Sequence, residues 1–182
     1  MTEPATEETT LAVLVPEAEA LVHPYRIERD PSAAEGMPAH LTILYPFKQI
    51  SDISDQDLHD LRRLFAAHMA FEFSLTEIAD FESTCAYLAP EPSAPFYALT
   101  DDVVSHYPDY PPYRGIYPDN APHLTVADIP DRAVFDRVMS QIRADAPKYL
   151  PIAATATKVS LMQRRGGRWQ RRMDFDLAKS TS

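Results

Sequence analysis

The chain alternates between stretches with strand-like and helix-like spacing of apolar residues. Short apolar runs and stretches of alternating polarity predict β-strands, because neighbouring side chains of a strand point to opposite faces. Such stretches lie at 11–15, 40–45, 71–81, 85–89, 123–127, 150–163 and 168–177. Two glycines, Gly166 and Gly167, separate the last two stretches and predict a hairpin.

Two further stretches, 54–70 and 131–144, have apolar residues at every third or fourth position, which predicts amphipathic helices. Ser54 stands where an N-cap is expected, and the apolar stripe of the first helix runs to Met69. The remaining expectations, set mainly by prolines, are a short helix at 96–107, one or two helical turns at 17–22, and loops at 24–38 and 108–122.

The order of these elements indicates the fold class. Strands and helices do not alternate strictly, which predicts an α+β protein with antiparallel sheets. A strand followed by a helix begins at His40 and again at His123, and this repeat predicts two pseudo-symmetric lobes. For a chain of 182 residues, we expect a flexible tail at 1–10 and a single two-lobed domain at 11–178.

Composition narrows the class of protein. Hydrophobic residues make up 45% of the chain and charged residues 24%, as in globular proteins. Cys85 is the only cysteine, so no internal disulfide can form, and a buried inert thiol in a reducing compartment is expected. No apolar run approaches the ~18 residues that cross a membrane. Because the acidic N-terminus is unlike a secretory signal, we expect a soluble cytoplasmic protein.

Charge limits the possible ligands. The net charge of −10 disfavours non-specific binding to duplex DNA, since neutralised phosphates supply most of that affinity. Six Lys and Arg residues and no acidic residue lie between Lys158 and Arg172. Such a local basic patch suits a small anionic ligand. The alternative is a solvated hairpin whose charges protect a sheet edge.

A short motif occurs twice, as Pro-Ala-His40-Leu-Thr42 and as Ala-Pro-His123-Leu-Thr125, and each copy opens a predicted strand. Residues two apart in a strand share a face, so each histidine lies beside its threonine while the leucine packs behind. If the two halves pack about a pseudo-two-fold axis, two imidazoles and two hydroxyls meet in one cleft.

Such a set of groups suits phosphoryl transfer. One neutral histidine can take a proton from water or a ribose hydroxyl while the other, charged, protonates the leaving oxygen. The threonine hydroxyls can donate hydrogen bonds to the phosphate oxygens, and no metal is required. The alternative, structural histidines beside strand-forming threonines, does not explain why the motif is repeated.

The paired motifs resemble the two-histidine (2H) phosphoesterase superfamily, and within it the bacterial RNA 2′,5′-ligase (LigT-like) or cyclic phosphodiesterase family. Supporting similarity covers roughly residues 11–177. It is carried by Leu-Val-Pro16, Arg26, the segment 38–47, Tyr87-Leu-Ala-Pro and Arg-Gly-Gly-Arg-Trp169.

The resemblance implies a LigT-like α+β fold with two lobes around a central cleft. It implies that His40 and His123 are the acid/base pair and that Thr42 and Thr125 bind phosphate oxygens. The implied partner is a small cyclic-phosphate nucleotide, an ADP-ribose cyclic phosphate or an RNA terminus, including 2′–5′ linkages. No metal, cofactor or membrane is implied, and we expect a monomer.

Four further residues are candidates for substrate binding: Tyr45, Arg26, Tyr113 and Arg114. Each has a structural alternative, in the core or rim, in an ion pair, or in an ordinary loop. At Asp128 the chain departs from the family pattern, which often has Arg or Tyr there. A carboxylate at this position would repel a second phosphate.

The function predicted from the sequence is metal-independent hydrolysis of a 2′,3′-cyclic phosphate or a related phosphodiester. Two alternatives stay open. The first is a nucleotide- or RNA-end-binding module with little turnover, which Asp128 and the acidic surface favour. The second is a 2′–5′ RNA ligase, which the net charge makes less attractive.

Overall fold

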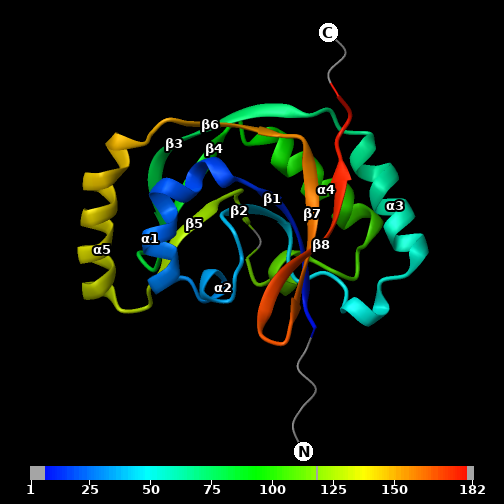
Figure 1. Ribbon diagram of the computed structural model, residues 1–182, viewed down its shortest axis with the longest axis horizontal. Helices are drawn as coiled ribbons and strands as arrows, with labels where there is room; N and C mark the ends of the chain where they lie inside the picture. Colours follow the sequence, from blue (N-terminus) through cyan, green and yellow to red (C-terminus); the bar gives the residue numbers. More distant parts are fainter. Residues whose placement is uncertain (1–6, 118, 180–182) are drawn as a thin grey trace, which may run out of the picture.

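The computed structural model of the protein describes residues 7–117 and 119–179 (Figure 1). The strands are β1 (Thr9–Leu14), β2 (His40–Leu44), β3 (Phe71–Phe81), β4 (Cys85–Glu91), β5 (Leu124–Asp128), β6 (Ile152–Ala156), β7 (Lys158–Arg165) and β8 (Arg168–Asp176). The α-helices are α1 (Glu19–Arg29), α2 (Pro31–Ala34), α3 (Asp55–Ala66), α4 (Ala94–His106) and α5 (Arg132–Asp145). Short 3₁₀ turns lie at Pro16–Ala18, Ile50–Asp52, Pro112–Gly115 and Ala146–Lys148.

The strands form two four-stranded antiparallel sheets, which confirms the predicted α+β class. The first sheet has the order β2-β1-β7-β8 and the second the order β5-β4-β3-β6. In both sheets, the motif strand therefore stands at an edge. Its neighbour is the strand that comes immediately before it in the chain, β1 for β2 and β4 for β5. This correspondence is the pseudo-symmetry of the two lobes.

The helices connect the two lobes in a reciprocal way. Helix α1, which lies between β1 and β2 in the chain, packs against β5 of the second sheet. Helix α4, which precedes β5, packs against β2 of the first sheet, where the Thr100 hydroxyl donates to the Ile43 carbonyl at 3.0 Å. Strands β2 and β5 also contact each other. Figure 1 shows α5 and α3 at opposite ends of the molecule, with the sheets between them.

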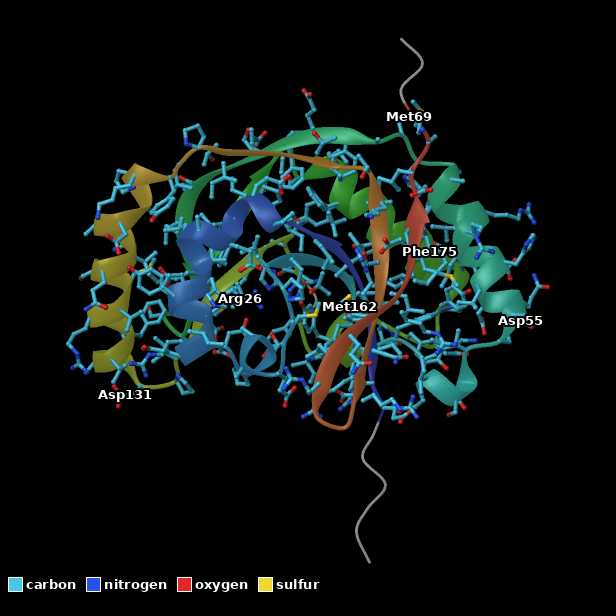
Figure 2. The ribbon with its side chains drawn as sticks, in the orientation of Figure 1. Arg26, Asp55, Met69, Asp131, Met162 and Phe175 are labelled. Atoms are coloured by element: carbon cyan, nitrogen blue, oxygen red, sulfur yellow. The ribbon has the colours of Figure 1, made fainter. Side chains whose placement is uncertain are left out.

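One hydrophobic core cluster runs through both lobes. At its centre, the ring of Phe96 on α4 packs edge-on against Phe71 and Phe73 of β3, with ring centroids 5.0 Å apart in both pairs. Phe175 of β8, labelled in Figure 2, packs against Phe65 of α3. Within the described ranges, no helix combines the length and the apolar composition needed to span a bilayer.

The N-terminal strand begins earlier than predicted. Thr9 and Thr10 belong to β1 and are buried, and each hydroxyl donates to a backbone carbonyl, of Lys48 and of Leu44. The predicted tail at 1–10 therefore extends too far, because buried threonines whose hydroxyls are bonded can stand in a strand as apolar residues do. Residues 1–6 of that tail lie outside the described residues.

The segment expected to be a loop at 24–38 is mainly helical, so this expectation was wrong. Helix α1 continues through Pro24 to Arg29, and α2 follows with Asp30 as its N-cap. Burial of Leu21 and Val22 outweighs the hydrogen bond that the proline removes.

The stretch 150–163, predicted as one strand, is two strands in different sheets. Strand β6 pairs with β3 and strand β7 with β1, and the chain passes from one sheet to the other at Thr157. The buried residues on the two sides of this break are Ala156 and Val159. They are three residues apart, whereas one continuous half-buried strand would bury every second residue. The stripe of the first predicted helix also ends early: α3 stops at Ala66 and Met69 is 50% exposed.

The Phe96 cluster leads to a stability prediction. Replacing Phe96, which is 1% exposed, by Ala should lower the free energy of unfolding by about 3–5 kcal/mol, because a cavity opens beside the rings of Phe71 and Phe73. The neighbouring Tyr97 is 43% exposed, and Tyr97→Ala should change this free energy by about 0.5 kcal/mol or less. Urea denaturation of both variants measures the difference, and equal losses would contradict the described packing.

Candidate active site

The two motifs show the same alternation of exposure. His40 and Thr42 are partly exposed, whereas Leu41 and Ile43 between and after them are 0% exposed. In the second copy His123 and Thr125 are partly exposed, and Leu124 and Val126 are 0% exposed. The predicted sharing of a face by each His/Thr pair is thus confirmed. We call His40, Thr42, His123 and Thr125 the motif face.

A third segment connects the two copies of the motif. The Tyr113 ring stacks on the His123 ring, with centroids 6.4 Å apart and planes inclined by 26°. The Tyr113 hydroxyl lies beside the Thr42 side chain, which acts to lower its pKa against a larger upward effect of burial. Because β2 and β5 also contact each other, residues of both copies surround one tyrosine.

Each imidazole is held by the same hydrogen bond. His40 Nδ1–H donates to the Pro38 carbonyl and His123 Nδ1–H to the Ala121 carbonyl, both at 2.7 Å. A carbonyl oxygen only accepts, so Nδ1 carries the proton in the neutral ring. The Nε2 atom of each ring is then left with its lone pair. Both histidines can therefore accept a proton at Nε2, and the two hydrogen bonds that hold the rings have the same length.

The surroundings keep both imidazoles neutral near pH 7. Burial, helped by the positive charge of Arg26, lowers the pKa of His40 from 6.5 to about 4, although the bond to Pro38 opposes this change. Burial also lowers the pKa of His123. A guanidinium contributes to the lowered pKa of His40 but not to that of His123. The two rings therefore differ electrostatically despite their equal hydrogen bonds.

Tyr113 is held by strained backbone. Tyr113 and Arg114 have φ angles of 49° and 57°, in the left-handed region, which costs about 1–3 kcal/mol for each non-glycine residue. The Tyr113 N–H donates to the Tyr45 carbonyl at 2.6 Å and ties this turn to the end of β2. The structure thus places Tyr45 and Tyr113 next to the motif face, with ring centroids 6.2 Å apart.

Arg114 lies farther out. Its side chain is 71% exposed and its guanidinium is 4.0 Å from a carboxylate oxygen of Glu8. The Tyr45 hydroxyl donates to the same carboxylate at 3.0 Å. Arg114 and Tyr45 therefore share Glu8 as a partner.

Arg26 is not placed as predicted for a residue that contacts substrate. It is 1% exposed, on the side of α1 that faces the strands (Figure 2), and its Nε donates to Asp30 Oδ2 at 3.1 Å. Its Nη2 is 3.1 Å from the same oxygen but has no hydrogen-bond partner. The enclosed guanidinium acts on the neighbouring His40 through its charge.

Two aromatic residues at the site were missed from the sequence. The rings of Phe81 and Tyr87 stack with centroids 4.1 Å apart, and they contact the His123 ring edge-on at 5.0 and 5.8 Å. The alternation of β3 would place Phe81 on the buried face with Phe73, but the register shifts between Leu75 and Ile78. This irregularity turns Phe81 toward His123. Its signal in the sequence is Glu77, which stands where the alternation expects an apolar residue, followed by Ile78.

The second sheet also brings a thiol and a carboxylate to the site. Cys85 Sγ lies 3.9 Å from Thr125 Oγ1, and the residue is partly exposed, not fully buried as expected. Burial raises the pKa of this thiol to about 11, so it stays protonated. Asp128 pairs with Cys85 across the strands. The residue as a whole is exposed, but partial desolvation of its carboxyl group and the charge of Asp30 raise its pKa.

Two antiparallel sheets that each present a His-x-Thr strand at one edge define the class of two-histidine phosphoesterases. The profile of the 2′-5′ RNA ligase superfamily matches residues 14–168, and the chain belongs to this superfamily.

Solved structures share the fold at low sequence identity. Escherichia coli LigT, crystallised with 3′-AMP, has a TM-score of 0.58 and 16% identity over 95% of this chain and 99% of its own. The protein TT0787 of Thermus thermophilus has a TM-score of 0.56 and 16% identity over 96% of this chain and 100% of its own. None of the curated proteins compared matches the chain.

The lowered pKa values lead to a prediction for titration. In NMR spectra of the imidazole carbons, His40 should titrate near pH 4 and His123 below 6.5, with assignments from His40→Ala and His123→Ala. Between pH 6.5 and about pH 4, His40 is protonated in the unfolded chain but not in the folded protein. The free energy of unfolding should therefore fall as the pH decreases from 6.5 to about 4. A His40 titration at or above 6.5 would contradict the described surroundings.

Proposed function

We propose that the protein hydrolyses the 2′,3′-cyclic phosphate of a nucleotide or RNA end, with His40 and His123 as the acid/base pair and without a metal. The observation that carries the proposal is the pair of equal Nδ1–carbonyl bonds, which leaves the Nε2 lone pair of each ring for proton transfer on a motif face that also carries two threonines. Membership of the 2′-5′ RNA ligase superfamily supports this class of chemistry.

The reaction needs one proton acceptor and one proton donor. One neutral Nε2 removes a proton from water, and the water oxygen attacks phosphorus in line as the bond to a ribose oxygen breaks. The other imidazole, which gains a proton when the phosphate anion binds beside it, gives that proton to the departing oxygen. The product is a phosphate monoester with a free ribose hydroxyl.

The threonines and tyrosines complete the proposed site. Thr42 and Thr125 donate hydrogen bonds to the non-bridging phosphate oxygens, where negative charge increases in the transition state. Tyr113 and Tyr45, whose rings lie next to the motif face, contact the sugar or base. Arg26 is a positioning residue in this scheme, since burial and, after it, the charge of Arg26 lower the pKa of His40 and keep this imidazole able to act as base.

A second candidate function is binding of a nucleotide or RNA end with little turnover. The exposed carboxylate of Asp128 beside the second motif favours it, because this charge opposes an anionic transition state near Thr125. Tight nucleotide binding without hydrolysis would support this alternative.

Loss of either histidine should strongly reduce turnover. In EDTA, wild-type protein should hydrolyse nucleoside 2′,3′-cyclic phosphates with a bell-shaped pH–rate profile, and His40→Ala or His123→Ala should lower kcat by about 10²–10⁴-fold. The exposed His59 on α3 provides the matched control, and His59→Ala should keep full activity. Product analysis by chromatography then shows which ester bond is cut. Activity that survives in both motif variants would refute the two-histidine mechanism.

The threonine hydroxyls should act mainly in the transition state. Thr42→Val and Thr125→Val keep the shape of the side chain, and each should lower kcat by about 10²–10³-fold with a smaller change in KM. Thr→Ser variants at the same positions retain a hydroxyl and should recover most of the rate. If valine is tolerated at either position, the hydroxyl there does not bind phosphate.

A further inference from the structure

A row of aromatic rings leads from the motif face to the β7–β8 hairpin. The Tyr45 ring lies between those of Tyr113 and Trp169, with centroids 6.2 and 6.4 Å away. Trp169 rests on a small apolar cluster that contains Met37 and Met162, and Met162 is labelled near the centre of Figure 2. The tryptophan is partly exposed, so its ring is a fixed apolar surface beside the site.

Strand register places Trp169 on the same face of the sheet as the motif. Ala12 is paired with Thr42 on one side and with Ser160 on the other. Residues two apart share a face, so Arg164, four residues beyond Ser160, and its cross-strand partner Trp169 lie on that face.

Two arginines stand beside Trp169. Arg164 is held by two hydrogen bonds to the Glu35 carboxylate, while the backbone N–H of Trp169 donates to the Glu35 carbonyl. Arg171 follows two residues after Trp169, opposite Met162, and its side chain is 55% exposed. The only acidic partner of Arg171 in the described ranges is Asp174, 3.5 Å away, a carboxylate that also binds Lys158 at 3.0 Å. Two cations thus share one anion.

The opposite side of the motif face has the reverse charge. Asp128 ends β5 there, and both it and Asp80 add to the negative potential at the Cys85 thiol. A second phosphate would be repelled by Asp128 and attracted by Arg171. Arg164 contributes less net charge on the hairpin side, because Glu35 pairs with it and Glu8 lies at the Tyr45 rim. Charge therefore distinguishes the two sides of the motif face, which the two equal motifs do not.

We propose that Trp169, with Arg171 and Arg164 beside it, forms a second nucleotide subsite, so that the preferred substrate is the end of a single-stranded oligonucleotide. The terminal cyclic phosphate lies on the motif face, the preceding base stacks on Trp169, and the phosphate between the two nucleosides meets Arg171. Aromatic stacking next to cations is the common means of holding single strands. This inference rests on the proposed function.

The test compares two substrates on the full chain. We expect wild-type kcat/KM for a dinucleotide with a 2′,3′-cyclic phosphate to exceed that for the matching nucleoside 2′,3′-cyclic phosphate by about tenfold or more, and added salt to reduce this ratio. Trp169→Ala and Arg171→Gln should bring the ratio close to one. Trp169→Phe keeps a ring and should retain part of it, and Arg143→Gln on α5 removes an exposed arginine far from the hairpin and should retain all of it.

Two outcomes would overturn the subsite: equal kcat/KM for both substrates in wild type, or a preference that survives in both Trp169→Ala and Arg171→Gln. ADP-ribose 1″,2″-cyclic phosphate is the third arm. A Trp169-dependent preference for it over the dinucleotide would overturn the oligonucleotide assignment. If Trp169→Ala does not fold, the substrate preferences of Trp169→Phe and Arg171→Gln still test the subsite.

Failure of the subsite can be distinguished from failure of the proposed function. If wild type hydrolyses neither substrate, calorimetry with a 3′-phosphorylated dinucleotide and the corresponding mononucleotide tests binding alone. Tighter binding of the dinucleotide, lost in Trp169→Ala, supports the subsite without turnover. Equal binding of the two ligands overturns it.

Discussion

The hydrogen bond from each imidazole Nδ1 to the carbonyl two residues earlier is the constraint on which the rest of the site depends. It fixes the tautomer and the ring orientation of His40 and His123, so both present the same nitrogen to a ligand. The backbone that supplies the first carbonyl is itself anchored, because the Ala39 N–H donates to the Glu19 carboxylate of α1 at 2.7 Å. The position of α1 therefore affects the orientation of the His40 ring through the short segment of Pro38 and Ala39.

What the sequence could predict was local. A period of two placed each histidine beside its threonine, and a Ser54 capping box confirmed the start of α3. The apolar pattern does not show which distant segments meet at the site. Tyr113 reaches the motif through left-handed backbone in a loop, Phe81 turns to the site after a register shift, and Arg26 is buried by packing of α1 on the other lobe. These depend on tertiary geometry, which no single stretch of residues encodes.

The two copies of the motif have equal bonds but unequal neighbours. His40 stands near a buried ion pair of Arg26 and Asp30, whereas His123 is packed among the rings of Phe81 and Tyr87. Charge and aromatic packing act on a protonated imidazole in different ways, since a guanidinium repels it directly, whereas packed rings exclude the water that would stabilise its charge. Identical residue types can thus take distinct roles without any change in the motif.

The order of strands in the first sheet also determines when the site can be completed. Strand β1 lies between β2 and β7, and β7 is reached only after the whole second sheet. During synthesis, one side of β1 lacks its hydrogen-bonding partner until residues 158–165 have left the ribosome. Both histidines precede that segment in the chain, yet the sheet that supports the first of them closes last. In a nascent chain, β1 therefore has an unpaired edge, and the first motif strand lacks its complete sheet, until this late segment emerges.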